Sequence, residues 1–207
     1  MTIERFIGNL KSVADTDIIE NQYRNPIPAD NLFVYLNYMT EISPETLFVG
    51  EAPGYLGCAL TGVPFTDEYR LTAKGNIGCL PLLRAGYSIA KQNQANPHKE
   101  MSATVMWSSF VSNSFFPMLW NIFPFHPHEL NNRNSNRTPT QKEIQAYIYV
   151  LNDLLTLLPT VKRIYAVGRK AEDMMNRLHM TIDYIRHPAR GGATECKEAI
   201  SIIARSA

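Results

Sequence analysis

The chain has 207 residues, of which 45% are hydrophobic and 19% are charged, and its net charge is +1. This length and composition suit a single domain over 1–207 with one substantial core, and they exclude a disordered chain. No apolar run approaches the length that a bilayer requires, so we expect no membrane partner. Residues 1–120 carry 8 basic and 11 acidic side chains, whereas 121–207 carry 12 basic and 8 acidic ones, a modest shift that would suit phosphate contacts from the second half.

The three cysteines, Cys58, Cys79 and Cys196, are odd in number and far apart in the sequence. This spacing argues against a disulfide framework and against a Cys-x-x-Cys metal site, so we expect free thiols in a reducing compartment. The first eleven residues lack the apolar core and the cleavage site of a secretory signal. We therefore expect a cytoplasmic protein, and we expect it to be a monomer.

Two helix-like stretches, 3–14 and 31–39, lie around Pro26 and Pro28 and predict an N-terminal helical layer over 1–45, ahead of a core in 46–207. The core opens with Leu47, Phe48 and Val49, an apolar run typical of a strand that is covered on both faces. Further along the chain, 80–89 has a helical pattern, 91–102 is polar and predicts a surface loop, and 103–111 suits another short helix.

The first strand leads into a turn, Gly50-Glu51-Ala52-Pro53-Gly54, whose glycines and proline permit a sharp bend and a close approach of a ligand. Glu51 would stand at the carboxyl end of a core strand, which is where open α/β sheets bind ligands. An ordinary turn with a solvated glutamate explains these residues nearly as well. Phe65 favours a site, because Gly62-Val63-Pro64-Phe65 offers a flat aromatic face that suits stacking on a planar ligand.

Asn121 lies in the apolar and aromatic run 119–127. A buried amide without hydrogen-bond partners costs about 1–3 kcal/mol, so either the backbone or a ligand must supply them. A local turn before Pro124, capped by the Asn121 side chain, and a ligand contact are both consistent with the sequence.

The second half of the chain alternates helices and strands, which predicts an open, mostly parallel sheet. A helix begins near Thr138 and Pro139, or at Thr140 with Glu143 as its capping-box partner, and it runs to Leu158. We expect strands at 163–167 and 181–186 and helices at 170–178 and 194–204. His187 follows the last strand, and a lone histidine at such a place more often makes a structural hydrogen bond than takes part in catalysis.

Five short motifs in this order resemble those of the uracil-DNA glycosylase superfamily. They are Gly50-Glu51-Ala52-Pro53-Gly54 with Gly62-Val63-Pro64-Phe65, then Asn121, then Asn136-Arg137-Thr138-Pro139 with Glu143, then Val167-Gly168-Arg169-Lys170-Ala171, and finally His187-Pro188-Ala189. The resemblance implies a three-layer α/β/α sandwich and an enzyme that hydrolyses the N-glycosidic bond of uracil flipped out of DNA, the first step of base excision repair.

The resemblance also implies roles for individual residues. Glu51 would activate water and offset positive charge on the sugar, and His187 would stabilise the uracil anion through O2. The base would contact Gly50, Ala52, Pro53, Phe65 and Asn121, with the Asn121 amide accepting from N3–H and donating to O4. The DNA would contact Arg186, Pro188, Arg190, Gly191 and Gly192.

The sequence departs from the iron–sulfur branch that shares the first motif, because it lacks that branch's cluster cysteines, so we expect neither a metal nor a cofactor. Gly57 and Cys58 replace an acidic pair of that branch, and Gly54 stands where some branches carry a tyrosine that excludes the thymine methyl. Either another side chain, such as Tyr55 or Glu51, excludes the methyl group instead, or the enzyme accepts more than uracil. The alternatives are a glycosylase for another deaminated base, such as hypoxanthine or xanthine, and a catalytically silent domain that binds DNA or a nucleobase.

Overall fold

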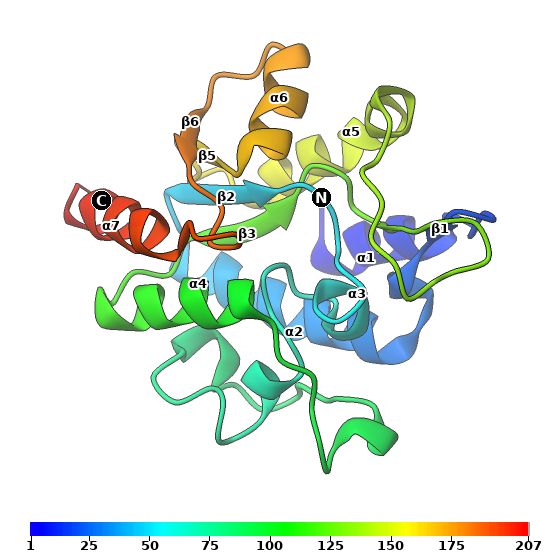
Figure 1. Cartoon of the computed structure of the whole chain (residues 1–207), viewed down its shortest axis with the longest axis horizontal. Coiled ribbons are helices and arrows are strands. Elements are labelled where there is room, and N and C mark those ends of the chain that lie inside the picture. Colours follow the sequence, from blue (N-terminus) through cyan, green and yellow to red (C-terminus); the bar gives the residue numbers. More distant parts are fainter. Residues whose placement is uncertain (207) are drawn as a thin grey trace.

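A parallel four-stranded sheet forms the centre of the fold in a computed structural model that describes residues 1–206 (Figure 1). The strands, in spatial order, are β3 (Met118–Asn121), β2 (Thr46–Gly50), β5 (Arg163–Val167) and β6 (Asp183–Ile185). Every residue of β2 and β3 is buried, as expected for strands covered on both faces. In this register Gly50 lies opposite Asn121, so both strands end at the same level.

Helices cover both faces of the sheet and complete three layers, which confirms the predicted α/β/α class. In Figure 1, α4 lies below the strands and α6 above them, and α7 packs against α4. The helices are α1 (Ile3–Ser12), α2 (Pro26–Ile42), α3 (Cys58–Thr61), α4 (Met101–Ser112), α5 (Gln141–Leu157), α6 (Arg169–Arg177) and α7 (Ala193–Arg205). No helix within residues 1–206 is both long enough and apolar enough to cross a membrane.

The helix boundaries follow local capping chemistry. Asn25 caps α2 through the Ile27 amide, and Pro26 occupies the first turn, where its missing N–H costs nothing. Of the two candidate starts of α5, the chain uses Thr140, which forms a complete capping box with Glu143. A short antiparallel pair, β1 (Ile19–Glu20) with β4 (His126–Pro127), is an element that the sequence pattern did not predict.

The helix predicted over 80–89 is wrong. This segment contains only a 3₁₀ turn, η3 (Leu80–Leu82), followed by irregular turns. Gly86 adopts φ +112°, a conformation outside any right-handed helix, so a helix over the whole segment cannot form. The other 3₁₀ turns are η1 (Gln22–Arg24), η2 (Tyr69–Leu71) and η4 (Lys91–Asn93).

The strand order places a site at the carboxyl ends of the strands. From β2 the chain crosses to β3 on one side, and it later returns to β5 on the other side of β2. Loops that leave β2 and β5 therefore diverge, and they open a crevice of the kind in which parallel sheets bind ligands.

Candidate active site

A cavity of about 490 Å³ opens at this edge of the sheet. Most of the site residues predicted from the sequence line it, namely Gly50, Glu51, Ala52, Pro53, Phe65, Asn121, Arg186, His187 and Arg190. Pro188, Gly191 and Gly192 do not line it. Pro188 and Gly192 are buried, Gly192 stands at the start of α7, and Gly191 is exposed at φ +80°.

Phe65 and Asn121 lie side by side against Gly50. A Cβ added to Gly50 would lie 2.6 Å from Asn121 Oδ1 and 2.7 Å from Phe65 Cζ, so only glycine leaves room for both side chains. Phe65 adopts φ +53°, which costs a non-glycine residue about 1–3 kcal/mol and is typical of functional sites. A flat ring and an amide thus lie together beside the last residue of β2, in one part of the cavity.

The Asn121 amide faces the cavity with few protein partners. Its Nδ2 lies 3.9 Å from Cys58 Sγ, and within residues 1–206 no group donates to its Oδ1. The amides that follow β3 instead continue the ladder, since Ile122 N–H donates to Gly50 O and Phe123 N–H to Glu51 O. The side chain therefore does not cap the turn before Pro124, and its hydrogen-bonding capacity is left for a ligand.

His187 is held in one orientation beside the turn after β5. Its Nδ1 accepts a hydrogen bond from the Ala189 amide at 3.1 Å, which assigns the proton of the neutral ring to Nε2. Burial lowers the pKa of His187, and the charges of Arg186 and Arg190 lower it further. A Cβ on Gly168 would lie 2.9 Å from the His187 Cβ, so the glycine lets this turn approach the imidazole.

Glu51 follows β2, and its carboxylate is half-buried beside a lysine that the sequence reasoning did not assign. Lys170 Nζ lies 3.5 Å from Glu51 Oε1, and it donates to Thr138 Oγ1 at 2.5 Å. Lys170 belongs to the first turn of α6, whose start lines the cavity. The sequence motif around Gly168 contains Lys170, but it indicated only a strand-to-helix turn and no role for this side chain.

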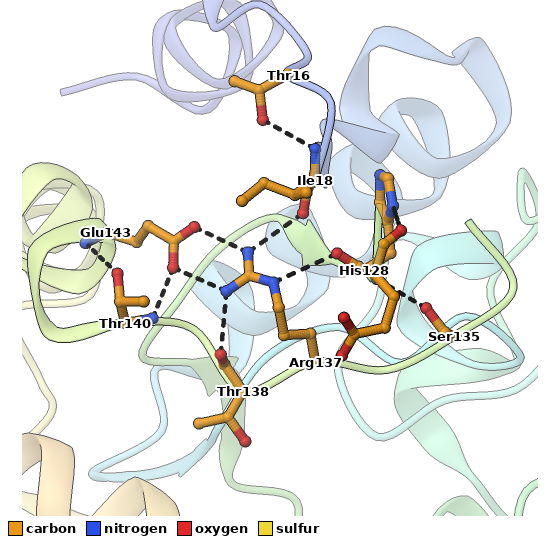
Figure 2. A network of polar contacts seen from close by, with 9 residues as sticks. Thr16, Ile18, His128, Ser135, Arg137, Thr138, Thr140 and Glu143 are labelled. Carbon is orange, nitrogen blue, oxygen red and sulfur yellow. Dashed lines mark hydrogen bonds and ion pairs between the residues drawn. The ribbon is translucent and has the colours of Figure 1, made fainter. Parts of the chain in front are cut away.

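Arg137, which lines the cavity, forms a frame of hydrogen bonds with Glu143. Their side chains form a two-bond pair at 2.8 and 3.0 Å, and the guanidinium also donates to the carbonyls of Ile18, His128 and Thr138 (Figure 2). Burial alone would raise the pKa of Glu143, but hydrogen bonds from Arg137 and Thr140 outweigh it and hold that pKa below its usual value.

The loop after β2 is held by side chains from this frame. Asn136 Oδ1 accepts from the Tyr55 amide at 3.0 Å, and His126 Nδ1 lies 2.8 Å from Pro53 O. Glu100, Cys58 and Ser102 also line the cavity, and sequence reasoning gave none of them a role. Glu100 lies in a stretch whose polar composition predicted only a surface loop, so composition gave no signal for it.

Comparison with known proteins defines the class. A family model described as the uracil DNA glycosylase superfamily matches residues 37–204. The match covers most of the chain, so the protein belongs to this superfamily and at that level is a DNA glycosylase, a hydrolase that acts on DNA. The family predicted from the five motifs is thereby confirmed.

A solved structure has the same fold. The crystal structure of wild-type SMUG2 from Pedobacter heparinus superposes with a TM-score of 0.66 at 16% sequence identity. The likeness spans 99% of this chain and 97% of that chain. At this identity it shows the fold alone. Comparison with curated protein sequences finds no match.

Proposed function

We propose that the protein removes uracil from DNA by hydrolysing the N-glycosidic bond, as the first step of base excision repair. The observation that supports this most is the packing of Phe65 and Asn121 together over Gly50, inside a cavity that also contains Glu51 and His187. A stacked base is out of reach of such a cavity, so the nucleotide must first rotate out of the duplex.

Base recognition would use the ring and the amide together. Phe65 offers its face to the extruded base, and base–aromatic stacking contributes about 1–3 kcal/mol. Asn121 accepts from uracil N3–H through Oδ1 and donates to O4 through Nδ2. Cytosine presents the opposite pattern at these two positions, so the same amide discriminates against it.

Bond cleavage builds positive charge on the sugar and negative charge on the departing uracil. His187, which lines the cavity and carries its proton on Nε2 in the neutral ring, would donate to uracil O2 as that charge develops. Glu51 would orient the attacking water and offset the charge on the sugar. Lys170 pairs with the Glu51 carboxylate, and its exposed ammonium would contact a DNA phosphate as well.

DNA binding would use the basic side chains around the cavity. Arg169, Lys170, Arg186 and Arg190 all line it, and the side chains of Arg169 and Lys170 are 69% and 63% exposed. Phosphate contacts of this kind supply affinity without reading sequence, which suits an enzyme that must inspect many base pairs.

The test is release of free base from matched duplexes that contain uracil, hypoxanthine or xanthine. We expect release of uracil, and we expect Glu51→Gln to lower its rate by about 100-fold, a typical loss for one acid–base partner. Glu198→Ala, at an exposed position of α7, is the matched control and should leave the rate unchanged. Release of hypoxanthine or xanthine without uracil would contradict the proposal, and DNA binding without any release would indicate a silent binding domain.

A further inference from the structure

Glu100 occupies space that two glycines of the active-site loop leave open. A Cβ on Gly57 would overlap its carboxylate, and a Cβ on Gly54 would lie 3.2 Å from its Oε1. Glu100 precedes α4 and lines the same cavity as Phe65 and Asn121. A carboxyl group from a distant part of the chain therefore covers the loop where side chains of the loop itself are missing.

The segment that presents Phe65 also holds Glu100 in place. Asp67, which is fully buried, accepts the Glu100 amide at 2.6 Å. The neighbouring Glu68, also buried, accepts from Asn93 at 2.8 Å and lies 2.6 Å from His98 Nδ1. Two consecutive buried carboxylates thus fix the backbone leading to Glu100, which indicates a defined position for its side chain.

The position of Glu100 relative to the base follows from the Asn121 amide. Nδ2 faces Cys58, and Cys58 directly follows Gly57, over which the Glu100 carboxylate lies. A uracil paired with Asn121 puts its O4 next to Nδ2, and C5 is the ring atom beyond O4. The C5 edge of the base is therefore directed to the side of the cavity that Cys58 and Glu100 form. Thymine differs from uracil only by a methyl group at C5.

The Glu100 carboxyl lacks an ion-pair partner within residues 1–206. Burial raises the pKa of this carboxyl, and the nearby Asp67 carboxylate raises it further. A hydrogen bond from the Ser102 side chain opposes this rise and satisfies part of the group. Water would satisfy the rest when the C5 edge bears only hydrogen. A methyl group at this place would displace that water and leave the remaining polar surface of the carboxyl without a hydrogen bond.

We propose that Glu100 is the residue by which this active site rejects thymine. This inference rests on the proposed function and deepens it, because it assigns to Glu100 the exclusion that Gly54 cannot provide. Glu100 does not touch the reacting atoms, so its loss changes the choice of base more than the rate on uracil.

The experiment measures a ratio, which is insensitive to partial loss of folded protein. Release of uracil from U·G duplexes and of thymine from T·G duplexes is compared for the wild-type protein, Glu100→Ala, Glu100→Gln and the control Glu198→Ala. In parallel, binding is measured to duplexes that carry 2′-fluoro-2′-deoxyuridine or its 5-methyl counterpart, which resist cleavage. One methyl group in a pocket is worth about 10- to 200-fold in selectivity.

We expect Glu100→Ala to raise the thymine-to-uracil ratio by about 10-fold or more, both in release and in binding. Glu100→Gln keeps the shape and the polarity of the side chain, so it should retain most of the wild-type preference, and Glu198→Ala should retain all of it. An unchanged ratio in Glu100→Ala, or a wild-type protein that binds both analogues equally, would overturn the inference. If the wild-type protein releases no uracil, the proposed function fails, and the binding ratio of Glu100→Ala still decides the role of Glu100.

Discussion

Gly50 determines the shape of the site through the side chain that it lacks. Because a Cβ there would meet both Asn121 Oδ1 and Phe65 Cζ, Gly50→Ala must displace the amide, the ring or both. A displacement of about 1 Å at a reacting site can cost about 100-fold in rate. We therefore expect Gly50→Ala to lower uracil release by about that factor, measured under single-turnover conditions.

Gly8 provides the matched control for this substitution. It lies within α1, and a Cβ there would meet nothing within 4 Å. Gly8→Ala should leave activity unchanged and raise the free energy of unfolding by about 0.5–1 kcal/mol, since alanine is the better helix former. Normal activity in Gly50→Ala would show that the packing of Phe65 and Asn121 is irrelevant to catalysis.

The protonation of His187 gives a prediction with a defined sign. Burial and the charges of Arg186 and Arg190 lower its pKa, so the neutral ring persists below the ordinary histidine value of about 6.5. Protonation of Nδ1 would break the bond from the Ala189 amide and turn the ring away from its productive orientation. Uracil release should therefore lose rate on the acid side only below about pH 6.5.

Arg190→Ala tests the cause of this shift. Removing one positive charge stabilises the imidazolium, so the pKa of His187 should rise and the acid limb of the rate should move to higher pH. An NMR titration of the His187 ring in the free protein measures the same change without DNA. If the acid limb of the rate stays in place or moves to lower pH, the charge of Arg190 does not lower the pKa of His187.

The segment between β4 and α5 depends on Arg137, which joins it to Ile18 near the N-terminus and to Glu143 in α5. Both side chains of the pair are only 16% exposed. Arg137→Ala leaves the half-buried Glu143 carboxylate without its charged partner and the carbonyls of His128 and Thr138 without this donor, so we expect a loss of about 3 kcal/mol in the free energy of unfolding. Thr156→Ala, on the exposed side of α5, should cost much less.

This pair also links stability to pH. The pKa of Glu143 is lower in the folded protein than in the unfolded chain, where it is about 4.3. Its contribution to stability is therefore present above pH 4.3 and is lost as pH falls through the lower folded value. Denaturant unfolding of wild-type protein and Arg137→Ala should converge in acid, and a gap that stays constant down to pH 2 would contradict this account.

The sequence predicts an element correctly where nearby residues mark both of its ends, and it fails where contacts between distant segments decide the structure. The strand at 163–167 has the predicted bounds, because Pro159 ends the helix before it and Gly168 directly follows its apolar run. The helix expected at 80–89 does not form, because Gly86 adopts a positive φ that no right-handed helix contains, which the apolar pattern could not show. Glu100 was missed for a different reason, since its place over Gly54 and Gly57 depends on contacts between distant segments.

At the scale of the whole molecule, the strand order gathers side chains from segments that are far apart in the sequence into one cavity, and basic residues surround it. DNA affinity should therefore fall steeply as salt rises. Arg186→Ala and Arg190→Ala should each reduce the slope of log K against log salt by about 1. Lys11→Ala, in α1, should leave it unchanged, and a flat salt dependence in the wild-type protein would contradict the proposed DNA surface.

Asn121 is the proposed reader of uracil in this cavity, and a single substitution tests that role. Asn121→Asp keeps the shape of the side chain but replaces the NH₂ donor with an acceptor, which repels uracil O4 and suits the 4-amino group of cytosine. The measurement is gel cleavage of matched duplexes that contain uracil or cytosine, with folding of the variant verified by its melting curve. We expect uracil excision to fall by up to about 10⁴-fold and weak release of cytosine to emerge. Excision of uracil by Asn121→Asp at the wild-type rate would show that Asn121 is not the base reader.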